Sequence, residues 1–270
     1  MKKLAIIFVS FIILTISCER DSVNIKTIKE STPKELSKLQ ILVDSLGISE
    51  KYNLSTIVHN PENKFEVVGI LHNYGCDFIL EKMKNINFEK NFDIKSNAYI
   101  KSGYEFAQTM NIEIPNGLLE AIPFDRMNSK GGFIDDENLQ MLVDSGLFTG
   151  NLKNLFIRLK DNISKCSNLK EVQNSVVLLE NEFLSDESLS ELERQNILCA
   201  CAVFRYSSAY WASKGINISD KGLFKWLLLG FSDLVGFGLG TSVGGPAAGV
   251  IAAADVSIAC YGIIENDVVY

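Results

Sequence analysis

The chain has 270 residues, of which 47% are hydrophobic, so it is long and apolar enough to bury a sizeable core in one or two domains. Its formal net charge is −7, and its basic residues are not gathered into a stripe. Because proteins bind nucleic acids largely through the phosphates, this acidic balance predicts no nucleic-acid partner.

The N-terminus has the parts of a secretory signal: Lys2 and Lys3, an apolar run from Leu4 to Leu14, and small or hydroxylated residues before Cys18. The uncharged stretch over residues 4–17 is shorter than the ~20 residues that a bilayer-spanning helix needs. We therefore expect a signal peptide that is removed, not a transmembrane helix.

A cysteine at this position resembles the lipobox of bacterial lipoproteins, with Thr15 and Ile16 where the family most often has leucine and a small residue. The resemblance implies cleavage before Cys18 and attachment of a lipid to its thiol. Removal of Lys2 and Lys3 would leave 24 of the 26 basic residues against 33 acidic ones, a formal charge of −9. The implied location is the cell envelope, at the outer membrane, facing the periplasm or the cell surface. The membrane is then a partner through the lipid on Cys18.

Composition divides the chain into four segments. Residues 1–17 are the expected signal peptide, and residues 18–31 are a polar, aperiodic stretch expected to be a flexible tether. Residues 32–220 carry helical hydrophobic periodicity, and residues 221–270 form a glycine-rich hydrophobic segment. Strand-like alternation is nearly absent, so we predict an all-α fold: a helical bundle with a C-terminal helical hairpin.

The first helix of the body has clear start and end signals. Thr32 is the expected N-cap, Pro33 takes the first helical position, and Glu35 completes a capping box. The leucines that follow at helical spacing, and the glycine expected to end the helix, are Leu36, Leu39, Leu42, Leu46 and Gly47.

Two later helices have capping boxes of their own, Asn168 with Glu171 and Ser188 with Glu191. The second of these pairs is expected to open the longest helix. The expected ranges of the later helices are residues 64–83, 96–110, 135–144, 151–163, 168–183 and 188–213. The apolar face of residues 151–163 consists of Leu152, Leu155, Phe156 and Leu159.

The C-terminal segment predicts a tight hairpin. Gly244-Gly245-Pro246 is a strong turn signal between two apolar stretches of helical length. Small residues four positions apart would let the two backbones approach closely. These residues are Gly236 and Gly240 on the first stretch, and Ala248 and Ala252 on the second.

This glycine-rich tail resembles bacteriocin-like and glycine-zipper proteins, which implies a membrane-active role if the hairpin enters a bilayer. Together with Gly69-x-x-His72-Asn73, the tail also resembles uncharacterised exported proteins of Gram-negative bacteria, and that resemblance implies no activity. Each stretch carries one aspartate near its middle, and a carboxylate at the bilayer centre costs ~2.5–3.5 kcal/mol. We therefore favour a hairpin that packs on the body.

The two aspartates, Asp233 and Asp255, each lie about 11 residues from the turn and should stand at the same height on antiparallel helices. Both are expected to point toward the small-residue seam or its edge. Carboxylates there require a cation, hydroxyl donors or a raised pKa. Arg205, which follows the apolar run of residues 199–204, is the candidate cation. Exposure of both aspartates on the helix surface is the alternative.

The cysteines and histidines predict no reaction centre. Cys199 and Cys201 would point about 200° apart on a helix and cannot pair, so buried free thiols are expected. His72 and Cys76 share a helix face, but two ligands are half a metal site, and a histidine packed near the core is the simpler interpretation. We find no nucleophile elbow, phosphate loop or dinucleotide fingerprint. The sequence thus predicts no catalytic residue, metal or cofactor.

The leading hypothesis is a lipid-anchored protein of the cell envelope with a non-enzymatic binding or structural role. The alternative is a membrane-active, bacteriocin-like effector that acts through the glycine-rich hairpin. A third possibility is an envelope hydrolase, which would need a cleft with converging polar groups.

Overall fold

The structure is a computed structural model that describes residues 33–84, 92–120, 122, 139–140, 143–144, 148–216 and 222–267. All regular secondary structure in these residues is helical, which confirms the all-α prediction. Residues 1–32, with Cys18 and Thr32, lie outside the described residues. The signal peptide, the lipid and the tether therefore stay predictions. Most of the helix expected over residues 135–144 lies outside the described residues as well.

The helices, in chain order, are α2 (Pro33–Leu46), α3 (Ser49–Tyr52), α4 (Glu66–Met83), α5 (Phe92–Thr109), α7 (Gly150–Ile163), α8 (Leu169–Ser185), α9 (Glu191–Ser213) and α10 (Gly222–Asp267). α10 consists of two arms, because the backbone of Gly245 leaves the helical region with φ 78° and ψ −176°. A positive φ favours glycine, and Pro246 then opens the second arm with its restricted φ. The predicted turn is confirmed.

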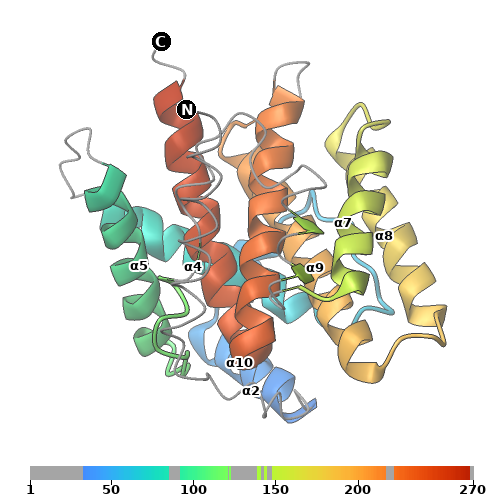
Figure 1. The fold of residues 1–270 in the computed structure, drawn as a ribbon, viewed down its shortest axis with the longest axis horizontal. Helices are drawn as coiled ribbons and strands as arrows, with labels where there is room; N and C mark the ends of the chain where they lie inside the picture. Colours follow the sequence, from blue (N-terminus) through green and yellow to red (C-terminus); the bar gives the residue numbers. More distant parts are fainter. Residues whose placement is uncertain are drawn as a thin grey trace, which may run out of the picture.

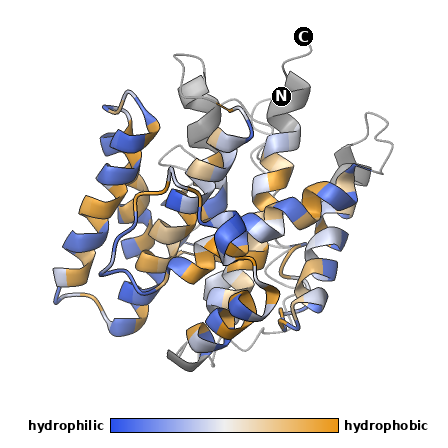
Figure 2. Cartoon of the chain, turned by 180° about the vertical axis from the view of Figure 1, so that it is seen from behind, coloured by the Kyte–Doolittle hydropathy of each residue, from blue (hydrophilic) through white to orange (hydrophobic). Residues whose placement is uncertain are grey.

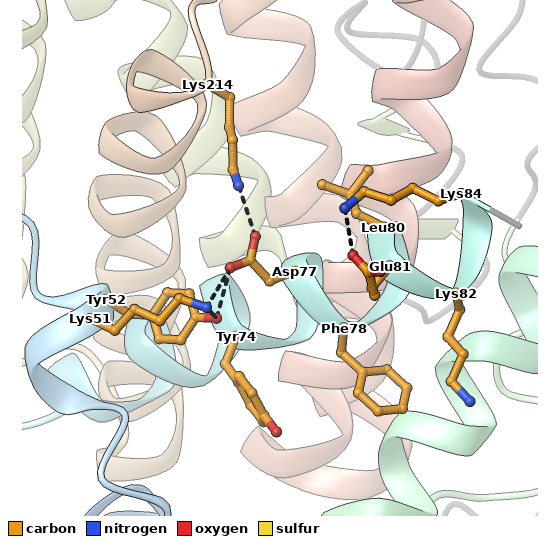
Figure 3. A pocket seen from close by; sticks show the side chains of 10 residues that line it. All are labelled: Lys51, Tyr52, Tyr74, Asp77, Phe78, Leu80, Glu81, Lys82, Lys84 and Lys214. Carbon is orange, nitrogen blue, oxygen red and sulfur yellow. Dashed lines mark hydrogen bonds and ion pairs between the residues drawn. The ribbon is translucent and has the colours of Figure 1, made fainter.

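The two arms of α10 stand side by side at the centre of the molecule (Figure 1), and they pack mainly against α4, α9 and α5. α8 packs on α9, and α7 packs on α8, on the opposite side of the molecule from α5 (Figure 1). α2 lies near the turn of α10 (Figure 1). α4 runs across α9 and α10 (Figure 3). The hairpin predicted over residues 221–270 is thus packed within the body, and not appended to it.

The close approach of the two arms depends on glycine. A Cβ atom at Gly240 would lie 2.4 Å from the carbonyl oxygen of Ala248, and one at Gly236 would lie 2.6 Å from that of Ala252. Atoms cannot approach so closely without displacing the backbone. The small-residue seam predicted from the sequence is confirmed at these positions.

The stretch Gly244–Gly262 is the one candidate membrane span among the described residues, with a mean hydropathy of 1.2. In this fold, 83% of the stretch is buried inside the protein. A helix buried at the centre of a folded domain can have the length and hydropathy of a membrane span. Its hydropathy alone therefore does not indicate a membrane location.

The outer helices are amphipathic, and hydrophilic residues alternate with hydrophobic ones along them (Figure 2). At the start of α8 the N-cap role of Asn168 is confirmed, because its side chain accepts from the backbone N–H of Glu171. The predicted capping box is only half formed, since the carboxylate of Glu171 accepts from the backbone N–H of Ser167 and from the side chain of Asn168. The apolar face predicted for α7 is buried, which confirms Leu152, Leu155, Phe156 and Leu159 as core residues.

The start of α9 is a correction. The helix begins after Ser190, which forms a capping box with Glu193. Ser188 instead donates to the carboxylate of Asp186 in the preceding turn. Both serines have a glutamate three residues later, so the sequence pattern fits either register. Leu189 is buried in the core and fixes the turn ahead of the helix.

The other differences are small. α5 begins at Phe92, before the expected position at residue 96. Gly47 ends α2 with a φ of 61°, as predicted, but Leu46 is 41% exposed while Val43 is fully buried. The buried face of α2 is formed by Leu36, Leu39 and Val43. Leu46 lies within about 20° of Leu39 around the helix, but it is the last residue of α2, at the end of the packed face.

Candidate functional site

Arg205 on α9 is completely buried and joins three parts of the fold. Its Nε lies 3.0 Å from Oε1 of Glu180 on α8, and its Nη2 lies 2.9 Å from Oε1 of Glu66 at the start of α4. Its Nη1 donates to the carbonyl oxygen of Val58 at 2.6 Å. The guanidinium group therefore fixes the loop between α3 and α4 against α8 and α9.

The same loop provides further donors to these glutamates. Asn60 and Asn63 each donate to a carboxylate oxygen of Glu180 at 2.8 Å. Burial raises the pKa of Glu180 above its ordinary value, although Arg205 offsets part of the shift. A buried ion pair with this many hydrogen bonds specifies one arrangement of its elements, because each unpaired partner would be costly.

The pairing of Arg205 with Asp233 or Asp255 was a wrong prediction, and so was the exposure of both aspartates. Neither aspartate contacts Arg205, and each has 0% of its side chain exposed. The residue of α9 that reaches Asp233 is Ser207. Two residues along a helix correspond to a rotation of about 200°, so Arg205 and Ser207 face opposite sides of α9.

Asp233, on the first arm of α10, is compensated by α9 and α4. Its Oδ2 accepts a hydrogen bond from Ser207 and lies 3.6 Å from Nε2 of His72. Its Oδ1 has no hydrogen-bond partner among the described residues. Burial disfavours a charged imidazole, but Cys76 and Asp233 beside the ring raise the pKa of His72 well above its ordinary value. The predicted hydroxyl donor is present, and a histidine stands where a cation was expected.

Cys76, His72 and Asp233 have the residue types of a catalytic triad without its geometry. The sulfur of Cys76 is 3.6 Å from Nε2 and 3.9 Å from Nδ1 of His72. These nearly equal distances show that the sulfur is not aligned with the lone pair of either ring nitrogen. Asp233 approaches Nε2 as well, whereas in a triad the acid and the nucleophile bind opposite nitrogens. All three side chains are fully buried, which confirms His72 as a packed core histidine.

Asp255, on the second arm of α10, faces α5. A Cβ atom at Gly103 would lie 3.2 Å from the carboxyl carbon of Asp255, so this carboxyl group packs on bare helix backbone. Neither of its oxygens has a hydrogen-bond partner in the described part of the chain. Burial, together with the negative charge of Glu120, raises the pKa of Asp255 well above its ordinary value. Of the predicted compensations, a raised pKa applies here and favours the neutral acid.

A fourth polar cluster faces solvent. It surrounds Asp77 on α4, in a hollow of about 790 Å³ between α3 and the end of α9 (Figure 3). Asp77 accepts hydrogen bonds from the hydroxyls of Tyr52 and Tyr210 at 2.8 Å, and its oxygens lie 3.0 Å from Nζ of Lys51 and 2.9 Å from Nζ of Lys214. Burial opposes ionisation, but these donors lower the pKa of Asp77 far below its ordinary value.

The rest of this hollow combines charged and apolar side chains. Lys84 pairs with Glu81 at its edge, and Lys82 pairs with Glu105 of α5 at 2.8 Å. No sequence pattern predicts the hollow, because its residues come from three separate segments. The lining, which we call the Asp77 hollow, consists of Lys51, Tyr52, Tyr74, Asp77, Phe78, Leu80, Glu81, Lys82, Lys84 and Lys214.

The cysteines of the described residues are free thiols, four of them buried and Cys166 partly exposed, which confirms the interpretation of Cys199 and Cys201. Burial raises the pKa of Cys199 and of Cys201 above the ordinary thiol value. Within the described ranges, no group of three or more His, Cys, Asp and Glu side chains could hold a metal ion. Comparisons of the chain with family models, curated proteins and solved structures found no match.

Proposed function

We propose that the chain is an exported protein of the cell envelope, anchored by a lipid on Cys18 at the outer membrane, with a non-enzymatic binding role. The support for export and anchoring is the N-terminal pattern that ends at Cys18. Each buried methylene of an attached acyl chain contributes ~0.8 kcal/mol, and two chains are enough for stable anchoring.

The observation that supports a binding role is the Asp77 hollow. Its lysines lie at the surface, between 40% and 68% exposed, so a ligand can reach them. The groups best suited to chemistry, His72 and Cys76, are sealed inside the core instead. A concave surface with a few converging polar groups and apolar walls is the usual form of a ligand site.

Metabolic labelling with a clickable fatty acid tests the anchor. We expect label on the wild-type chain and on Cys166→Ala, and none on Cys18→Ala. Cys166 is the matched control because it is the most accessible of the other described thiols. Equal labelling of the wild type and Cys18→Ala would contradict the proposal.

The second candidate is a membrane-active effector, and the apolar stretch Gly244–Gly262 favours it. A peptide covering residues 222–264 would then release dye from liposomes at concentrations where a scrambled peptide does not. An inert peptide would remove this candidate. The burial of both arms of α10 supports the first proposal, since a hairpin committed to the core is not available for insertion.

A further inference from the structure

The Asp77 hollow carries a local excess of positive charge. Four lysines and two acidic residues line it, a formal charge of +2, which becomes +1 when Glu105, the partner of Lys82, is included, in a chain whose total is −7. Lys214, Lys51 and Lys84 approach the exposed turn of α4 from three sides (Figure 3). A small negatively charged group entering the hollow would therefore meet ammonium groups in several directions.

The ammonium groups keep donors available. Each has three N–H groups. Lys51 uses one on Asp77 and one on the hydroxyl of Tyr52, and Lys214 uses one on Asp77. Lys84 uses one on Glu81. These contacts, within the described residues, leave N–H groups that can turn toward a ligand.

Asp77 positions two of these lysines. Its Oδ2 binds the ammonium group of Lys51 and its Oδ1 binds that of Lys214. Each oxygen also accepts one hydrogen bond from a tyrosine, Oδ2 from Tyr52 and Oδ1 from Tyr210. The two ammonium groups among these donors more than balance its single negative charge. Asp77 thereby fixes the ammonium groups, while it also competes with any ligand for them.

The hollow has an apolar part as well. Leu80, Phe78 and Tyr74 line it and are only partly buried; Leu80 lies on the side of α4 that carries Lys84, and the two rings project from the opposite side (Figure 3). A purely ionic ligand would leave the apolar surface of Leu80 in contact with water. Burying it would add ~25 cal/mol for each Å² of apolar area removed from water.

We propose that the Asp77 hollow binds an anionic amphiphile, with a carboxylate or phosphate group held by Lys51, Lys214 and Lys84 and an apolar portion against Leu80. This inference rests on the proposed binding role. The chemistry is shared by free amphiphiles and by the headgroup region of anionic lipids. The binding measurement uses purified protein, so its result is independent of the labelling of Cys18.

Isothermal titration of the full-length chain with octyl phosphate tests the proposal. Octyltrimethylammonium, which has the same tail and the opposite charge, is the control ligand, and inorganic phosphate tests the need for the tail. Vesicles of phosphatidylglycerol, compared with vesicles of phosphatidylcholine, show whether a lipid headgroup can be the source of the anion.

Three variants give opposite expectations. Lys51→Gln and Lys214→Gln should each weaken binding of octyl phosphate about tenfold, because each removes one charge-assisted contact. Asp77→Asn should strengthen it, because the competing carboxylate is lost while the lysines remain. Lys170→Gln, an exposed lysine on α8, should change nothing. Circular dichroism shows whether each variant is folded, and the lysine variants decide the test if Asp77→Asn unfolds.

The proposal is supported if octyl phosphate binds, if the affinities of the variants change in the expected directions, and if added salt weakens binding. Absence of binding would overturn it. So would equal binding of the cationic amphiphile, or affinity unchanged in both lysine variants. Inorganic phosphate that binds as tightly as octyl phosphate would refute the apolar half of the site.

Discussion

Replacing Asp255 by asparagine should change how the stability of the protein depends on pH. The side chain is fully buried against Gly103, and its oxygens have no hydrogen-bond partner among the described residues. Its pKa in the folded state is raised well above the ordinary value by burial and by Glu120. The other ionisable group facing it from α5 is Tyr99, whose own pKa is raised to about 12 by burial and by Asp255.

The sign of the effect follows from proton binding. In the unfolded chain, the carboxyl group has a pKa of about 3.9. Between that pH and the raised pKa of the folded state, the folded protein holds one more proton than the unfolded chain. The stability that the neutral acid allows is therefore fully present below pH ~3.9, and it is lost as the pH rises through the folded pKa. The loss amounts to ~1.4 kcal/mol for each pH unit within this window.

An amide has nearly the same shape and does not titrate. The free energy of unfolding of Asp255→Asn, minus that of the wild type, should therefore increase with pH at ~1.4 kcal/mol per unit. Over two pH units in which the folded protein keeps the proton, the change is ~2.7 kcal/mol. The slope of this difference with pH tests the neutral acid. Its absolute size does not, because the N–H donors of the amide also need hydrogen-bond partners in the buried site.

Urea unfolding at several pH values, monitored by tryptophan fluorescence, measures this difference. Trp211 is a suitable probe because it is buried and stacked on Tyr261. Glu35 and Glu180 also have raised pKa values, but their contributions cancel when the variant is compared with the wild type. Asp44→Asn, at an exposed carboxylate, is the control and should follow the wild-type curve. Parallel curves for Asp255→Asn and the wild type would refute a neutral Asp255.

Three further outcomes are expected. Gly240→Ala should lower the free energy of unfolding by about 1–3 kcal/mol, because the new methyl group meets the carbonyl of Ala248. Gly150→Ala, with open space around it, should not lower it, and equal losses in both variants would contradict the seam. Ser190→Ala should cost about 1 kcal/mol through loss of the N-cap of α9, and an unchanged urea midpoint would refute that role. In native protein, maleimide should label Cys166 well before the four buried thiols, as followed by mass spectrometry. Equally rapid labelling of all five thiols would disprove the burial of the four.

The features predicted correctly from the sequence are those set by neighbouring residues. Asn168 and Glu171 cap α8 through contacts within one turn, and Gly47 ends α2 because glycine accepts a positive φ. The seam of the hairpin was predictable for the same reason. Residues four apart on a helix share a face, so Gly236 and Gly240 indicate a face that another helix backbone can approach closely.

The partners of the buried charges were not predictable, and α9 shows why. From Ile197 to Trp211 this helix is buried on every side, so its hydropathy has no periodicity that would orient Arg205. An arginine in such a run turns toward whichever carboxylates the tertiary fold supplies. Here these are Glu66 and Glu180, which lie 139 and 25 residues away in the chain. The Asp77 hollow was missed for the same physical reason, since tertiary packing alone brings Lys51 and Lys214 together.

Polar contacts, more than apolar ones, distinguish the two roles considered for the hairpin. A seam of small residues favours close helix packing in a protein core and in a bilayer alike, so Gly236 and Gly240 fit both. The aspartates differ. Asp233 has Ser207 and the imidazole of His72 beside it, and both would be lost if the arm left the body. Asp255 occupies an apolar site in which its raised pKa favours the neutral acid, so transfer to a bilayer brings it no new partner. Each contact of the first arm with α4 and α9 thus adds to the cost of extraction, which supports a hairpin that serves as the core of the fold.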